Sequence, residues 1–264
     1  MLEELKKLWR YRSTIWIMTT SNLKLKYASS YLGFLWSILE PLLLILVYSL
    51  VFPLILKTNF FEWVLFFICG LLPYRFLNIG FVETTRSIVD MRNIIIKTNI
   101  PTEVIPISKA LSSAITFLLE SVVFFSIVFL SGVQPTNFIL LFPVLFVTEF
   151  FIILGVGFYL SSLFVRFRDL TYILNIAFQA LLFLCPIVYT LVMVPEIYRG
   201  VYLLNPISRL ILLYQSVILH SASSFIEYLP VLENTVVLFI FSIAVLLIGY
   251  LQFNKRKHNF AGEL

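Results

Sequence analysis

The sequence predicts an all-α polytopic membrane protein with six transmembrane helices. Hydrophobic residues make up 60% of the 264 residues and charged residues only 12%, about half the charged fraction of a typical soluble domain. Long apolar runs recur along the chain, and residues 170–195 contain no Asp, Glu, Lys or Arg. Because a helix rises about 1.5 Å per residue, roughly 20 apolar residues cross the hydrocarbon core of a bilayer.

The apolar runs give the order of the spans. The six predicted spans cover residues 31–56, 63–82, 110–130, 138–164, 170–192 and 231–253. A further apolar stretch, 201–219, is broken by Asn205-Pro206 and carries Arg209. We expect this stretch to form a re-entrant helix pair within an outer region at 195–228. Irregular backbone at membrane depth is tolerated where protein or a watery cavity satisfies its polar groups.

The basic residues predict the orientation of the chain in the membrane. Most of the 19 Lys and Arg residues lie in the segment 1–30, in the loops 83–109 and 165–169, and in the tail 255–264. Positive residues favour the cytoplasmic side, so these segments are expected there and both termini are cytoplasmic. Two termini on one side require an even number of crossings. Counting 201–219 as a full span would place the tail outside.

The segment 1–30 is predicted to be an amphipathic helix at the membrane interface, before a single transmembrane domain at 31–254. Its apolar side chains fall roughly on one helical face: Leu2, Leu5, Leu8, Trp9, Ile15 and Trp16. Its basic side chains lie mostly off that face: Lys6, Lys7, Arg10 and Arg12. Such a helix rests at the headgroup level with its apolar side towards the lipid, so membrane lipids are an expected partner.

Several function classes are disfavoured. The net charge of +5 comes from clusters at the ends of apolar runs, a pattern that encodes topology and not nucleic-acid binding. Cys69 and Cys185 lie inside apolar runs, and His220 and His258 have no neighbouring ligand cluster, so no metal site is expected. No nucleophile–base pair indicates a catalytic site. No Gly is followed by Lys, so the chain has no phosphate-cradling Gly-x4-Gly-Lys loop and must depend on another source of energy.

Five local sequences, in this order, resemble the permease subunits of ABC-2-type polysaccharide exporters, which move lipid-linked O-antigen or teichoic acid precursors. They are KYASSYLGFLW at 26–36 with Glu40-Pro41 and Val51-Phe52, GLLPY at 70–74, IKTNIPTEVIP at 96–106, RFRDL at 166–170 with PIVY at 186–189, and Asn205-Pro206. Together the strings extend over most of the chain. One departure is mild: the family often has a basic residue after the first Pro of the cytoplasmic loop, whereas Thr102 and Glu103 follow Pro101 here.

This resemblance implies a bacterial inner-membrane subunit that exports lipid-linked polysaccharide such as O-antigen. It also implies a separate ATPase subunit, present in two copies, which binds ATP and Mg²⁺, so this chain itself needs no cofactor. One six-span chain is too small to enclose a wide pore, and a path at the interface of a homodimer is therefore expected. Export of teichoic acid, a drug, a lipid or haem is the alternative within the family.

Two alternatives lie outside the family: a proton-coupled carrier and a structural membrane protein. Four ionisable residues occur within or near the spans: Glu40, Arg75, Glu120 and Glu149. Such groups serve in proton relays or pair with one another for structure. The sequence has no internal repeat, a feature that many secondary carriers show.

The loop 83–109 contains the candidate coupling segment. Its centre, residues 90–97, is predicted to form a short surface helix, which Asn99 and Pro101 end. The resemblance favours its docking on the ATPase, while a connector resting on the membrane is the alternative. The candidate coupling residues are Arg92, Asn93, Ile94, Ile95, Ile96, Lys97 and Pro101.

Two aromatic stripes are candidates for a substrate path. Tyr31, Phe34, Tyr48 and Phe52 fall near one face of the first span, and Tyr172, Gln179 and Phe183 fall on one face of the fifth. Aromatic residues at helical spacing usually pack against neighbouring helices. If they line a path instead, their rings would stack on the C–H faces of sugars and let a polymer slide.

Overall fold

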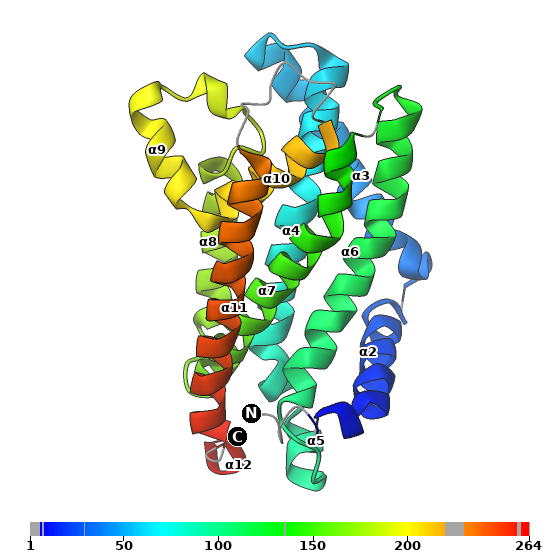
Figure 1. Ribbon diagram of the computed structural model, residues 1–264. Coiled ribbons are helices and arrows are strands. Elements are labelled where there is room, and N and C mark those ends of the chain that lie inside the picture. The colour runs from blue at the N-terminus through cyan, green and yellow to red at the C-terminus, as the bar shows by residue number, and fades with distance from the viewer. Residues whose placement is uncertain are drawn as a thin grey trace.

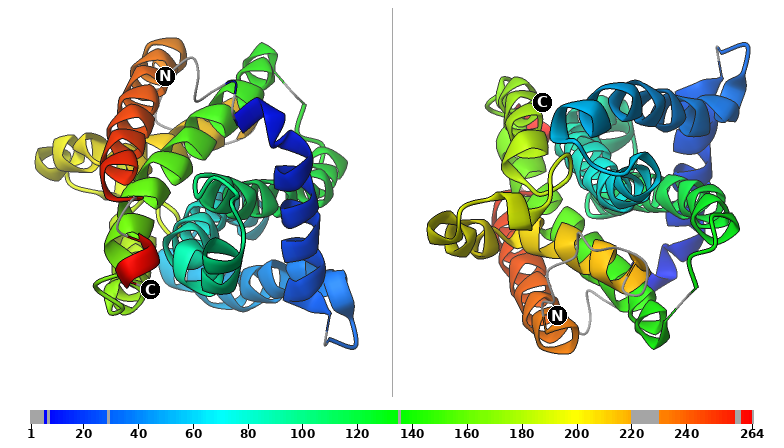
Figure 2. Two further views of the ribbon diagram at one scale, coloured as in Figure 1. Left: turned by 90° about the horizontal axis from the view of Figure 1, so that it is seen from below. Right: turned by 90° about the horizontal axis from the view of Figure 1, so that it is seen from above.

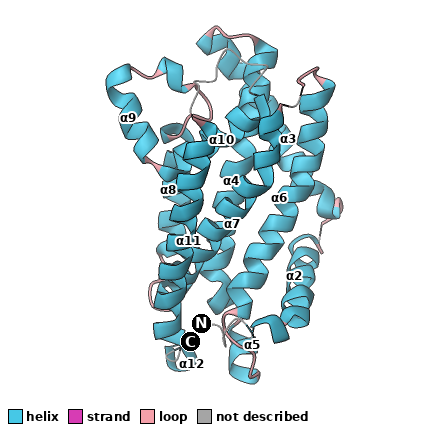
Figure 3. Ribbon diagram, viewed as in Figure 1, coloured by secondary structure: helices cyan, strands magenta, loops and turns pink. Residues whose placement is uncertain are grey.

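The computed structural model describes residues 6, 8–28, 30–134, 136–219, 230–257 and 260–263, and the regular elements in these ranges are helices (Figure 3). The α-helices are α2 (Arg12–Tyr27), α3 (Trp36–Leu56), α4 (Phe60–Asp90), α5 (Arg92–Lys97), α6 (Val104–Leu130), α7 (Phe142–Phe164), α8 (Leu170–Leu184), α9 (Glu196–Leu204), α10 (Pro206–Leu219), α11 (Val231–Arg256) and α12 (Phe260–Glu263). Short 3₁₀ turns occur at Gly33–Leu35, Asn137–Leu141 and Leu191–Met193. The predicted all-α class is confirmed.

Among the described residues, five helical segments are long and apolar enough to cross a membrane. They are Gly33–Leu56, Phe60–Asp90, Val104–Leu130, Asn137–Phe164 and Val231–Arg256. A sharp turn separates the first two: Lys57 adopts the left-handed conformation (φ 52°), and the Asn59 side chain accepts hydrogen bonds from the amides of Phe61 and Glu62. Left-handed residues end helices and Asn side chains begin them, so Lys57 and Asn59 define the first hairpin.

Helix α4 organises the bundle. It contacts α3, α6, α7, α8 and α10, and Figure 2 shows it near the centre of the bundle. Its side chains Trp63, Phe67 and Leu77 are almost fully buried. Phe76 stacks on Phe117 of α6, with ring centroids 4.7 Å apart. Large aromatic side chains therefore supply much of the packing around α4.

Helices α7 and α11 approach each other most closely at two glycines. A Cβ atom added at Gly249 would overlap the backbone of Gly155, and one added at Gly155 would lie 2.6 Å from the carbonyl carbon of Val245. In lipid, association of helices depends on close packing, which small residues at the crossing point allow. Because glycine has no side chain, the two backbones can touch at Gly155 and Gly249.

The predicted fifth span, 170–192, is helical only over the 15 residues of α8, fewer than the roughly 20 residues that cross a bilayer as helix. The backbone after Leu184 is irregular except for a 3₁₀ turn. Its carbonyl groups are satisfied from other helices: Val188 O accepts from Trp63 Nε1 (2.9 Å) and Pro186 O accepts from Gln215 Nε2 (3.0 Å). These donors make the early end of α8 compatible with membrane depth.

The predicted break at Asn205-Pro206 is confirmed, because α9 and α10 meet there at an angle of 100°. Asn205 Oδ1 accepts a hydrogen bond from the amide of Ile207 (3.0 Å) and so begins α10. The pair and the start of α11 lie at the upper end of the bundle in Figure 1, whereas α5, α12 and the loop between α7 and α8 lie at the lower end. Residues 220–229, the end of the predicted outer region, lie outside the described residues.

The amphipathic segment contributes α2, which packs along α6 (Figure 1). Thr19 is buried and its hydroxyl donates to the carbonyl oxygen of Ser108 (3.3 Å). Trp9 and Trp16 are exposed, at 71% and 59%. The helix therefore has one face fixed to the bundle and one face open, while Leu2 and Leu5 lie outside the described residues.

Candidate functional site

The candidate coupling segment forms the predicted short helix, α5, between the ends of α4 and α6. Asp90 is the last residue of α4, and α5 ends at Lys97, where Thr98 is extended and its hydroxyl donates to Ile94 O (2.7 Å). The chain then reaches buried Pro101. The helix is confirmed, and its docking role remains an expectation.

The two faces of α5 have different surroundings. Ile94 and Ile95 are half-buried and pack against the hydrophobic core. The other face is open: Ile96 is 54% exposed, and Arg92, Asn93 and Lys97 are exposed as well. Of the seven candidate residues, these four are positioned to meet another protein, whereas Ile94, Ile95 and Pro101 support the helix.

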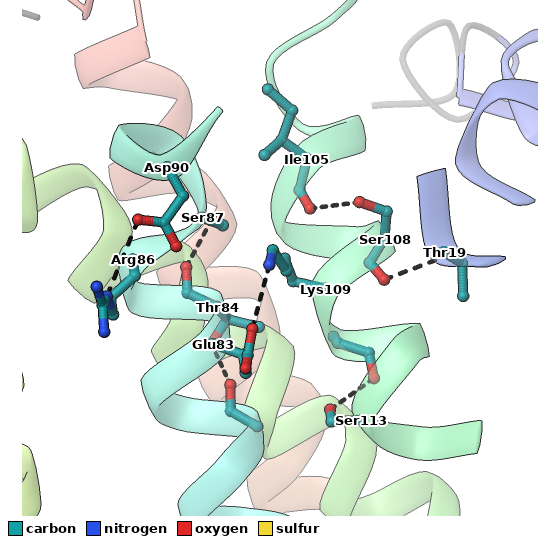
Figure 4. Close-up of polar contacts among 12 residues, drawn as sticks. Thr19, Glu83, Thr84, Arg86, Ser87, Asp90, Ile105, Ser108, Lys109 and Ser113 are labelled. Carbon is teal, nitrogen blue, oxygen red and sulfur yellow. Dashed lines mark hydrogen bonds and ion pairs between the residues drawn. The ribbon is translucent and has the colours of Figure 1, made fainter. Parts of the chain in front are cut away.

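Two ion pairs connect the ends of the helices that precede and follow α5. Lys109 Nζ of α6 lies 3.2 Å from Glu83 Oε2 of α4 (Figure 4), and Lys257 Nζ lies 2.7 Å from Glu103 Oε1. Both Glu103 and Lys109 are mostly shielded from solvent. These pairs join α4 to α6 and the start of α6 to the end of α11. Helix α5 itself contacts α4. No local sequence pattern indicates these pairs, because their partners are 26 and 154 positions apart in the chain.

The aromatic stripe of the first span divides into two parts. Tyr48 stacks on Phe67 of α4 (5.2 Å between centroids), and Phe52 stacks on Trp63 (5.9 Å). These two rings therefore pack against α4 within one chain. Tyr31 and Phe34 lie before α3, where Tyr31 is fully exposed and Phe34 is 37% exposed.

The candidate residues of the fifth span lie on an open face. Tyr172 and Phe183 are 70% and 54% exposed, and Gln179 is also exposed. Helices α8 and α3 both contact α4, so α4 holds in place the two helices that carry the candidate stripes.

The ionisable residues of the spans are arranged mainly as pairs. Arg75 of α4 lies 3.2 Å from Glu40 of α3 and 3.9 Å from Glu120 of α6. The side chains of Arg75 and Glu120 are 9% and 3% exposed. Glu149 of α7 is fully buried and has no basic partner in the described part of the chain. Three of the four groups thus form a cross-helix cluster that ties α3 and α6 to α4.

Among the described residues, no group of three His, Cys, Asp or Glu side chains could hold a metal ion. Cys69 and Cys185 are free and buried. The structure is a bundle of apolar helices, with the broken pair α9–α10 at one end and the exposed short helix α5 at the other. These features define a polytopic membrane protein with a surface on which a soluble partner could act.

Comparison with known proteins identifies the family. A model of the ABC-2 type transporter family matches residues 13–219. The chain belongs to this family, as the resemblance of its local sequences predicts. Its membrane domain lacks an ATPase site, in agreement with the absence of a phosphate-cradling loop from the sequence, and ABC-2 permeases work with separate ATP-binding subunits.

Named relatives extend over nearly the whole chain. It is 28% identical over 246 residues to an O-antigen export system permease protein RfbA of Klebsiella pneumoniae, covering 93% of this chain and 92% of that protein. It is 29% identical over 267 residues to an O-antigen export system permease protein RfbA of Myxococcus xanthus, covering the full length of both.

Proposed function

We propose that this chain is the permease of an ATP-driven exporter that moves a lipid-linked, O-antigen-like polysaccharide outward across the bacterial inner membrane. The observation that carries the proposal is the full-length similarity to proteins named as O-antigen export permeases. Membership of the ABC-2 family favours coupling to a separate ATPase over a proton-coupled carrier. The cross-helix pairing of Arg75 with Glu40 and Glu120 also gives these charges a structural role.

In this proposal two copies of the chain work with two copies of the ATPase, and both termini are cytoplasmic. ATP binding draws the ATPases together, and the exposed face of α5 transmits the movement. Helix α5 contacts α4, and the ion pairs Lys109–Glu83 and Lys257–Glu103 support this step because they connect α4 to α6 and α6 to the end of α11. Helix α4 in turn contacts α3 and α8, the helices of the candidate path.

The path is proposed to lie between two copies, along the open faces of α3 and α8. On α8 this face presents Tyr172, Gln179 and Phe183. On α3 it is aliphatic, with Leu46, Leu50 and Leu54 all at least half exposed. An apolar face of this kind requires lipid or protein against it, and a second copy related by two-fold symmetry would supply the same two helices.

Deletion of the gene in its native host tests the cargo. We expect surface polysaccharide to be lost and its lipid-linked form to accumulate inside the cell, measured by gel electrophoresis of surface and membrane extracts. A plasmid copy should restore export only when the host ATPase retains its catalytic residues. Normal surface polysaccharide, with loss of teichoic acid, lipid, haem or drug export instead, would contradict the proposed cargo and identify the alternative.

A further inference from the structure

A polar cavity of about 270 Å³ lies between α2, α4 and α6. Helix α2 contributes Asn22 and Lys26, α4 contributes Glu83, and α6 contributes Lys109 and Ser112. Since a water molecule occupies about 30 Å³ of liquid, the volume suffices for a tetrahedral oxyanion with part of the group that carries it. The cavity lies beside α2 and α6 and is separate from the open faces of α3 and α8.

One donor in this cavity has no partner. Asn22 is 7% exposed, and its Nδ2 atom makes no hydrogen bond to any described residue. A buried amide N–H without an acceptor is destabilising, and such groups in native proteins commonly meet a ligand or an ordered water. The amide of Asn22 is therefore a buried donor that an acceptor in the cavity could satisfy.

The charges around Asn22 define the acceptor. Lys109 Nζ contacts Glu83 Oε2 at 3.2 Å (Figure 4), and an ammonium group has three N–H donors, so Lys109 can also serve a second acceptor. Lys26 adds another positive charge to the lining. The side chains that line the cavity include two ammonium groups and one carboxylate, and this lining favours an anion over a cation. The Glu120 carboxylate of α6, which is outside the lining, also interacts with Lys26.

The position of the cavity indicates where the anion comes from. Its α2 wall belongs to a basic helix with an exposed tryptophan, Trp16, a type of helix that lies among lipid headgroups. Apolar side chains, Leu25 and Ile79, line the cavity beside the polar groups. The lining thus combines cationic donors with an apolar wall, as a phosphate attached to a lipid requires.

We propose that this cavity binds a phosphate group, carried by the headgroup of an inner-leaflet lipid, through Asn22, Lys26 and Lys109. Bound phosphate would fix α2 against α4 and α6 next to the base of α5. The hydrogen bond from Thr19 to Ser108 O already holds α2 at this place (Figure 4). Free inorganic phosphate has the same chemistry, so it is the second source that the test must separate.

The test uses the full chain purified in a neutral detergent, with thermal unfolding followed during titration. The ligands are dioleoyl phosphatidylglycerol, dioleoylglycerol, which lacks the phosphate, and inorganic phosphate. We expect the phospholipid to raise the melting temperature and dioleoylglycerol to have little effect, because a ligand that binds the folded state stabilises it. An equal effect of inorganic phosphate at the same concentration would contradict the lipid source and assign the site to the free ion.

Matched variants show whether the phospholipid raises the melting temperature by binding in this cavity. Asn22→Leu and Lys26→Gln should each weaken the phospholipid effect, by about tenfold in apparent affinity. Lys24→Gln removes the same charge from the same helix, but Lys24 is outside this cavity, so its titration should match the wild type. Asn22→Leu removes an unpartnered buried donor, and the ligand-free variant should therefore stay folded. A wild-type response from Asn22→Leu, or an equal loss in Lys24→Gln, would overturn the proposal.

Discussion

Gly155 of α7 and Gly249 of α11 meet backbone to backbone, with no room for a side chain on either residue. These two helices have the most extensive contact in the described structure. A small-residue contact of this kind replaces the hydrophobic driving force that is missing between helices in lipid. It fixes α11, and with it Lys257, relative to the rest of the bundle.

Gly249→Ala is therefore expected to destabilise the protein. Overpacking at such a contact costs about 1–3 kcal/mol, although Ala is the better helix former by about 1 kcal/mol. Gly200→Ala is the matched control, since no atom lies within 4 Å of a Cβ added at this exposed position of α9. Thermal unfolding in detergent should show a loss for Gly249→Ala and no loss for Gly200→Ala. Equal melting temperatures would contradict the close contact.

The cluster around Arg75 predicts unequal effects of two similar substitutions. Glu120→Gln changes a carboxylate that is 3% exposed, whereas Glu40→Gln changes one that is 63% exposed. Disruption of a buried pair costs about 3–5 kcal/mol, and exposed pairs contribute about 0–1 kcal/mol. Unfolding measurements should thus show the larger loss for Glu120→Gln. The reverse order would mean that Glu40 is the main partner of Arg75.

Aromatic residues of the two candidate stripes should respond differently to Ala. Tyr48→Ala removes ring stacking with Phe52 and Phe67, and each aromatic pair contributes about 0.5–1.5 kcal/mol. Tyr172→Ala and Phe183→Ala change exposed rings and should leave the melting temperature unchanged while reducing polysaccharide export. Normal export by the stable double variant Tyr172→Ala with Phe183→Ala would contradict a path along α8.

The open face of α5 predicts where the ATPase binds. Ile96→Asp should weaken co-purification of the ATPase and leave the melting temperature unchanged, because Ile96 is 54% exposed. Ile95→Asp should lower the melting temperature instead, since Ile95 packs against the core and a buried carboxylate is costly. Intact ATPase binding and export by Ile96→Asp would argue that α5 is a connector on the membrane surface.

The predicted topology can be measured with reporter fusions. A reporter after Leu264 should be active only inside the cell, and one at Ser223 only outside, although Ser223 lies outside the described residues. The basis is the excess of Lys and Arg in the segments assigned to the cytoplasm. A cytoplasmic signal at Ser223 would mean that 201–219 crosses the membrane.

The sequence by itself predicted the helical class, the main spans, the short helix at 92–97, the break at Asn205-Pro206 and the family. These features depend on properties that are local in the chain. An apolar run must match the thickness of the bilayer, and Pro206 lacks the N–H that would continue a helix through it. The absence of a phosphate-binding loop can likewise be read from consecutive residues.

Only the tertiary structure decided which donors satisfy the backbone that follows α8 and which aromatic rings are packed. The carbonyl of Val188 meets the indole of Trp63 across 125 positions of the chain, and no local pattern around Leu184 announces that donor. Tyr48 and Phe183 are both aromatic residues in predicted spans. Tyr48 stacks on Phe67 of α4, whereas the side chain of Phe183 is exposed. Hydrogen bonds, ion pairs and ring stacking depend on distances of a few ångströms between remote residues, and those distances exist only once the helices have packed.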